Sequence, residues 1–116
     1  MFWAFLYSPF YLFCREIKMK YFFVIGNKTS ESLSPLIFNH WFKKYNIKAK
    51  YYFVEVNKRG FEKVLLRKIH NNKTKGLNIT IPFKKDILKH LELKNLHVKK
   101  IGAANCVTLG KKIKGI

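Results

Sequence analysis

The sequence predicts an α/β fold: a three-layer sandwich built on a mostly parallel, mixed sheet with one antiparallel strand near the C-terminus. Two patterns lead to this prediction. Apolar segments typical of strands alternate along the chain with segments of helical spacing, which favours parallel strands covered by helices. Near the end, the tight turn Gly110-Lys111 joins two predicted strands and forces an antiparallel pairing. A length of 116 residues fits a single domain.

Three strands are expected to form the parallel part of the sheet, at residues 21–26, 51–56 and 76–81. The first is a continuous apolar run that ends at a glycine, which is typical of a buried parallel strand. In the third, apolar residues alternate with Asn78 and Thr80, so these two polar side chains share one face. Right-handed crossovers should place the three strands side by side.

Helices are expected between and after these strands. The first runs from Ser34 to about Tyr45, with Ser34 as its N-cap and Pro35 in the first helical position. The remaining helical segments, of which the last is short, are expected at residues 60–69, 83–91 and 93–101. Two further strands complete the pattern, at residues 106–109 and 112–116.

Lys84 is the unusual residue of this pattern. After the strand 76–81, Pro82 is expected to start a helix, which puts Lys84 in the first helical turn. An acidic residue is favoured there, because the positive end of the helix dipole opposes a cation. Two interpretations follow from the residues alone: a lysine kept for its chemistry, or a solvated surface lysine neutralised by Asp86.

The formal net charge of +18 raises nucleic acid, or another polyanion, as a partner. The basic residues lie in scattered pairs rather than in long runs, and nearly all are lysines. Base recognition favours arginine for its bidentate fork, and the chain has only Arg15, Arg59 and Arg67. The composition therefore argues against nucleic acid as the partner.

The cysteines point to a reducing compartment. Cys14 and Cys106 are too few for a disulfide framework, and they lack the spacing of metal ligands. The four histidines show no metal spacing either, so no metal site is expected. A cytoplasmic protein is therefore expected.

Residues 1–18 look separate from the domain, which we expect to span residues 19–116. Residues 1–14 are strongly apolar and aromatic, but this stretch is shorter than the roughly 20 residues that span a bilayer. Met19 lies just before the first predicted strand, so the simplest interpretation is a start at Met19 and an upstream mis-translation. A peripheral membrane anchor is the alternative.

Polar side chains gather where the predicted strands end. Ser32 and Ser34 lie beside a predicted helix N-terminus, where hydroxyls and backbone N–H groups can hold a carboxylate or phosphate. Asn105 follows three small residues, where backbone can approach a ligand closely. As a simpler alternative, Ser34 is only a helix cap and Asn105 an ordinary turn residue. No Gly-x-Gly-x-x-Gly and no P-loop occurs, so no dinucleotide site is expected in this chain.

Three segments resemble motifs of the shikimate dehydrogenases, in the family's order and spacing. They are Ser32-Leu33-Ser34-Pro35, Asn78-Ile79-Thr80-Ile81-Pro82-Phe83-Lys84 and Ile101-Gly102-Ala103-Ala104-Asn105. The resemblance covers about residues 19–116, the family's N-terminal substrate-binding domain. It implies an α/β sandwich on a mixed sheet. It also implies an oxidoreductase of the shikimate pathway, which reduces 3-dehydroshikimate to shikimate with NADPH bound by a second, Rossmann domain.

The resemblance also implies roles for individual residues. Ser32 and Ser34 would hold the substrate carboxylate with help from Thr80, and Asn78 and Asn105 would hold ring hydroxyls. Lys84 is similar to the family's catalytic lysine, which lies beside the reacting C3 oxygen. A positioned ammonium there can stabilise a developing alkoxide and pass it a proton.

The chain also departs from the family. Lys28, Thr29 and Glu31 stand where the first motif usually has Pro, Ile and His, and Cys106 replaces a usual Thr. A carboxylate at Glu31 could weaken the binding of an anion. The sequence stops before the family's Asn-Thr-Asp motif, whose Asp partners the lysine. The expectation is therefore a truncated family member, without the nucleotide-binding domain, inactive alone and binding no NADP. A quinate-using relative and a non-catalytic polyanion-binding module remain the alternatives.

Overall fold

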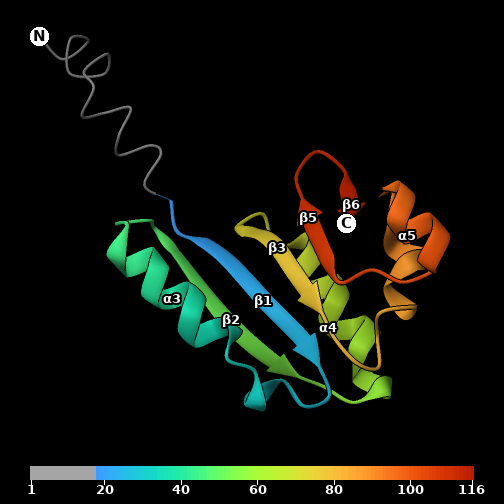
Figure 1. Ribbon diagram of the computed structural model, residues 1–116, viewed down its shortest axis with the longest axis horizontal. Coiled ribbons are helices and arrows are strands. Elements are labelled where there is room, and N and C mark those ends of the chain that lie inside the picture. The colour runs from blue at the N-terminus through green and yellow to red at the C-terminus, as the bar shows by residue number, and fades with distance from the viewer. Residues whose placement is uncertain (1–17) are drawn as a thin grey trace, which may run out of the picture.

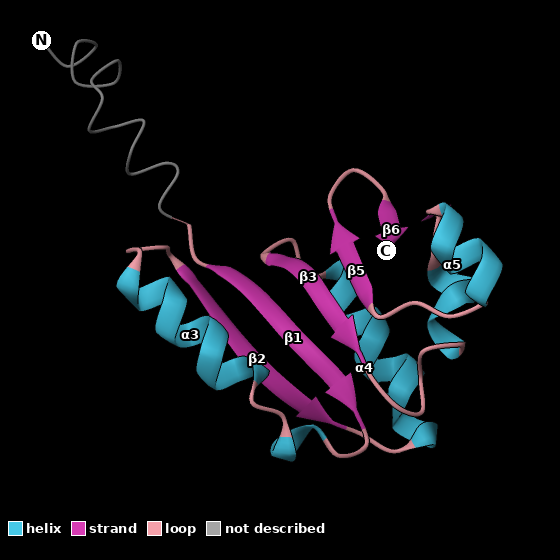
Figure 2. Ribbon diagram, in the orientation of Figure 1, coloured by secondary structure: helices cyan, strands magenta, loops and turns pink. Residues whose placement is uncertain are grey.

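The computed structural model describes residues 18–116, which form a six-stranded mixed sheet with helices on both faces (Figures 1 and 2). The expectations for residues 1–17 lie outside the described residues. The strands are β1 (Lys20–Gly26), β2 (Ala49–Glu55), β3 (Thr74–Ile79), β4 (Leu93–Lys94), β5 (Cys106–Leu109) and β6 (Ile113–Gly115). The helices are α3 (Ser34–Lys44), α4 (Lys58–His70) and α5 (Leu96–Ile101), with short 3-10 turns η1 (Thr29–Glu31) and η2 (Asp86–His90).

The sheet has the order β2-β1-β3-β5-β6-β4, and the predicted fold class is confirmed. β1 pairs in parallel with both β2 and β3, as the alternating pattern predicted. β5 runs antiparallel to both of its neighbours, β3 and β6, whereas β4 pairs in parallel with β6. The short strand β4 was not predicted, because two residues carry no detectable periodicity.

The two faces of the sheet are packed unequally. Alternation along β1 sends Phe23 to one face and Phe22 to the other. On the first face lies the main core, which joins β1 and β3 to α4 and to the segment that contains Phe83. The ring of Phe83, with 0% of its surface exposed, stacks on that of Phe61 with the centroids 4.1 Å apart. On the second face α3 packs beside β2, and the ring of Phe42 contacts Phe22.

The predicted helix at residues 83–91 is wrong. After β3 the chain makes turns, and its only helical part is the five-residue 3-10 turn η2, which begins at Asp86. The reason is tertiary: the backbone carbonyl of Lys84 accepts a hydrogen bond from the N–H of Ala104 (2.9 Å). That carbonyl is then not paired within a helical turn. Lys84 therefore does not lie in a first α-helical turn, and the helix-dipole argument does not apply to it.

The segment predicted as a short helix at residues 93–101 divides into β4 and α5. The side chain of Asn95 accepts a hydrogen bond from the N–H of Val98 (2.9 Å) and so caps the start of α5. Gly102 ends the helix in the left-handed conformation, with φ of 72°. This turn directs the following loop, which carries Asn105, back toward β3. Within residues 18–116, no helix is long and apolar enough to cross a membrane.

Candidate functional site

A cleft of about 500 Å³ opens at the carboxyl ends of β1 and β3. This is the edge at which open α/β sheets place their ligands. The cleft is lined by Val24, Lys28, Thr29, Glu31, Ser32, Ser34, Phe38, Asn78, Ile79, Thr80, Lys84 and Asn105. The structure thus brings together all six of the residues that the sequence suggested, from three separate segments: Ser32, Ser34, Asn78, Thr80, Lys84 and Asn105.

Two backbone hydrogen bonds hold the third segment against the second. The N–H of Ile79 donates to the carbonyl of Asn105 (2.7 Å), and the N–H of Ala104 donates to the carbonyl of Lys84 (2.9 Å). The Asn105 loop is therefore tied both to the end of β3 and to the turn that carries Lys84. The Lys84 side chain is half-buried, and no ion pair joins it to Asp86 within residues 18–116. The predicted neutralisation by Asp86 is thus not seen there.

Neither serine is the N-cap of α3. The carbonyl of Leu33 accepts a hydrogen bond from the N–H of Ile37 (3.0 Å), so Leu33 is the N-cap and Ser34 is the first residue of α3. Ser32 has an extended backbone (φ −71°, ψ 134°), and its Oγ accepts a hydrogen bond from the N–H of Ser34 (3.2 Å). The prediction of Ser34 as N-cap is therefore wrong. Ser34 keeps its hydroxyl for other partners.

Asn78 has a partner that the sequence analysis missed. The hydroxyl of Tyr51, in β2, donates a hydrogen bond to Oδ1 of Asn78 (2.6 Å). Tyr51 is only 3% exposed. Burial, with a smaller contribution from Cys106 and a small opposing hydrogen bond to Ser34, raises the pKa of Tyr51 to about 12. The phenol is thus neutral, and remains a donor, at physiological pH.

The lining of the cleft includes Lys28, Thr29 and Glu31, the three residues that depart from the family's first motif. Lys28 and Lys84 bring positive charge, and Glu31 brings a negative one. Thr29 is 1% exposed, and its hydroxyl oxygen has no hydrogen-bond partner among the described residues.

Outside the cleft, Ser30 donates two hydrogen bonds to the Glu55 carboxylate, one from its hydroxyl (2.8 Å) and one from its N–H (3.1 Å). These bonds lower the pKa of Glu55.

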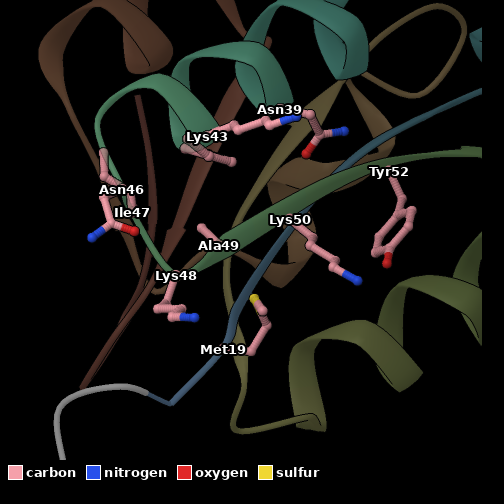
Figure 3. A pocket seen from close by; sticks show the side chains of 10 residues that line it. Met19, Asn39, Lys43, Asn46, Ile47, Lys48, Ala49, Lys50 and Tyr52 are labelled. Atoms are coloured by element: carbon pink, nitrogen blue, oxygen red, sulfur yellow. The ribbon is translucent and has the colours of Figure 1, made fainter.

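A second hollow, of about 490 Å³, lies at the opposite end of the sheet, where β2 begins (Figure 3). Lys43, Lys48 and Lys50 are among the residues that line it, and none of the six predicted site residues does. It offers positive charge, two asparagine amides (Asn39 and Asn46) and the Tyr52 hydroxyl, but none of the motif residues of the cleft. Within residues 18–116, no group of histidine, cysteine or acidic side chains is arranged to hold a metal ion.

Comparisons with known sequences identify relatives. The family described as shikimate dehydrogenase substrate binding domain matches residues 24–107. The shikimate dehydrogenase (NADP(+)) of Clostridium beijerinckii is 42% identical over 91 residues, which are 78% of this chain and 33% of that protein. That of Pelagibacter ubique is 45% identical over 75 residues, or 63% of this chain and 27% of that protein.

Solved structures have the same fold. Shikimate dehydrogenase 1 from Peptoclostridium difficile aligns with a TM-score of 0.75 at 32% identity, covering 84% of this chain and 37% of that one. The shikimate 5-dehydrogenase of Listeria monocytogenes, solved in complex with shikimate and NAD, aligns with a TM-score of 0.79 at 26% identity, covering 84% and 34%. The chain spans about a third of the length of these relatives. It belongs to the shikimate dehydrogenase family, of which it carries the substrate-binding domain.

Proposed function

We propose that the cleft binds shikimate and 3-dehydroshikimate, and that the chain provides the substrate-binding part of an NADP-dependent shikimate dehydrogenase. The observation that carries this proposal is the meeting of six motif residues, from three segments, in one cleft. Its volume of about 500 Å³ lies within the usual range for small-molecule sites. The Listeria monocytogenes relative, solved with shikimate, supports the choice of ligand.

The hydroxyl groups of Ser32, Ser34 and Thr80 are assigned to the substrate carboxylate. A serine hydroxyl has one proton to donate and two lone pairs that accept. Because Oγ of Ser32 accepts the N–H of Ser34, its own proton remains for an anion. Lys28 and Lys84 add favourable charge around the same space. A carboxylate in this position would receive charge-assisted hydrogen bonds, which are stronger than neutral ones.

The amides of Asn78 and Asn105 are assigned to the ring hydroxyls, and Lys84 to the reacting oxygen. Reduction of the ketone creates negative charge on that oxygen, and an ammonium nearby stabilises the charge and supplies a proton. NADPH supplies the hydride in enzymes of this name. No glycine-rich dinucleotide motif occurs in the 116 residues, so the steps assigned to this chain are binding, orientation and proton delivery.

A titration of shikimate into the isotopically labelled 116-residue chain, followed by NMR, tests this function. We expect shifts at the residues of the cleft, and loss of binding in the double variant Ser34→Ala, Lys84→Ala. Lys85→Ala is the matched control, because it removes a neighbouring, exposed lysine that does not line the cleft. Shifts that persist in the double variant, or that map to the lysine hollow of Figure 3, would instead indicate binding by charge alone.

A second assay addresses the cofactor. We expect the 116-residue chain to show no oxidation of NADPH with 3-dehydroshikimate, because it lacks a dinucleotide fingerprint. Enzyme-like turnover by the purified chain would contradict the proposal that it provides only the substrate-binding part of the enzyme. It would leave the assignment of the substrate cleft in place.

A further inference from the structure

Tyr51 lies behind the wall of the cleft without lining it. In the sheet, Tyr51 of β2 is paired with Phe22 of β1, and Asn78 of β3 is paired with Val24. The Tyr51 side chain therefore reaches across the central strand to place its hydroxyl 2.6 Å from Oδ1 of Asn78. Contacts with α3 hold both the backbone and the ring of Tyr51 in this direction.

The backbone of Tyr51 is held by α3. Nδ2 of Asn39 donates to the carbonyl of Tyr51 (2.7 Å), and the N–H of Tyr51 donates to Oδ1 of Asn39 (2.8 Å). β2 is at the edge of the sheet, so these backbone groups have no strand partner on that side. The Asn39 amide takes the place of a neighbouring strand and sets the position of α3 along β2.

The ring of Tyr51 is held by the same helix. Phe38 stacks on it with ring centroids 4.9 Å apart and an angle of 8° between the planes. Phe38 lines the cleft, as does Ser34 one turn earlier in α3. Tyr51 thus contacts α3, which carries one wall of the cleft, and Asn78 in β3, which carries another.

The hydrogen bond to Tyr51 decides what Asn78 can offer a ligand. An amide side chain has an accepting oxygen and a donating NH₂ group. The phenol occupies one lone pair of the oxygen and so fixes the orientation of the amide, in which the NH₂ group is the donor left for the cleft. Without the phenol, the amide could rotate and present either group, and the ordering would have to be supplied by ligand binding.

We propose that Tyr51 is a positioning residue of the substrate site, which fixes the Asn78 amide so that its NH₂ group donates to a hydroxyl oxygen of the ligand. This deepens the proposed function and rests on it for the identity of the ligand. Tyr51 itself does not contact the ligand; its hydroxyl affects binding through Asn78.

The test compares Tyr51→Phe with Tyr52→Phe, using the 116-residue chain and shikimate as the probe. Tyr51→Phe keeps the stacked ring and removes only the hydroxyl. Tyr52 is the next residue of the same strand, but it points to the other face, where it stacks with Tyr21 and Phe23. We expect the dissociation constant to rise roughly three- to tenfold in Tyr51→Phe, the usual effect of one hydrogen bond, and to be unchanged in Tyr52→Phe.

A double-variant cycle separates positioning from a general loss of structure. If Tyr51 acts through Asn78, then Tyr51→Phe has little further effect on affinity in an Asn78→Ala background. Full additivity of the two changes would overturn the proposal, as would an unchanged affinity in Tyr51→Phe.

The side-chain amide resonances of Asn78 provide a readout that needs no ligand. In the unmodified chain they should give one set of signals, with a slowly exchanging Tyr51 hydroxyl proton nearby. In Tyr51→Phe they should shift or broaden, and unchanged resonances would overturn the proposal. If the unmodified chain failed to bind shikimate, the proposed function would fail, whereas this measurement would still decide the role of Tyr51.

Discussion

The N–H of Ala104 donates a hydrogen bond of 2.9 Å to the backbone carbonyl of Lys84. This bond joins the turn of the lysine to the loop of Asn105, and the bond from Ile79 to Asn105 joins the same loop to β3. The cleft therefore depends on the path of the chain between α5 and β5. Gly102 sets that path where the helix ends.

Gly102→Ala should lower the free energy of unfolding by about 1 kcal/mol, because a Cβ is disfavoured at positive φ. An added Cβ at Gly102 meets no atom within 4 Å, so the cost would come from the backbone alone. Gly110→Ala is the matched control, because its Cβ would also meet nothing and its φ lies outside the left-handed region. Chemical denaturation measures the free energy of unfolding of both variants. Equal losses of stability would contradict an explanation based on the positive φ of Gly102.

Glu31→Gln should tighten the binding of shikimate roughly two- to fivefold, the size expected for one exposed charge. The carboxylate lines the cleft and repels an anionic ligand, whereas glutamine has nearly the same shape without the charge. The gain should shrink as salt is added, because salt screens exposed charges. Glu92→Gln, which removes an exposed carboxylate outside the cleft, is the control. An equal gain in both variants would indicate an effect of net charge only.

Thr29→Val should raise the free energy of unfolding by about 1 kcal/mol, because a buried hydroxyl without a partner costs free energy that a methyl group does not. Valine has nearly the same shape, and the Thr29 oxygen has no partner among the described residues. Thr108→Val, at an exposed position in β5, should change stability little. Urea denaturation checks both variants, and a loss of stability in Thr29→Val would mean that the hydroxyl has a partner in solution.

Alkaline pH should destabilise the chain through Tyr51. Its pKa is raised from 10.0 to about 12 in the folded chain. Below pH 10 the phenol is neutral in both states, and its contribution is fully present. Between pH 10 and 12 the unfolded chain loses this proton first, so the free energy of unfolding falls.

Tyr51→Phe should lose less stability than the unmodified chain over that pH interval, and Tyr52→Phe should behave as the unmodified chain does. Denaturation at pH 9, 10 and 11 measures this difference at pH values chosen around the ordinary tyrosine pKa of about 10. If the free energy of unfolding fell equally with pH in all three proteins, the raised pKa of Tyr51 would be contradicted.

The sequence by itself determined the parallel part of the sheet and the edge where the polar residues meet. Periodicity is a local property: the alternation through Asn78 and Thr80 and the apolar run that ends at Gly26 depend only on neighbours in the chain. Parallel strands joined by helices place their carboxyl ends on one edge. The grouping of Ser32, Asn78 and Lys84 follows from that arrangement.

Tertiary structure alone decided how each of these residues is held. Lys84 lies in a turn because its carbonyl is bonded to Ala104, a residue distant in sequence, and no local pattern reports such a bond. The hydroxyl of Ser32 accepts the N–H of Ser34 because the helix begins one residue earlier than predicted, at the N-cap Leu33. The contact of Tyr51 in β2 with Asn78 in β3 depends on the strand order, which places both strands beside β1. Hydrogen bonds between distant segments outweigh local preferences here, because a buried polar group without a partner costs more than a helical turn contributes.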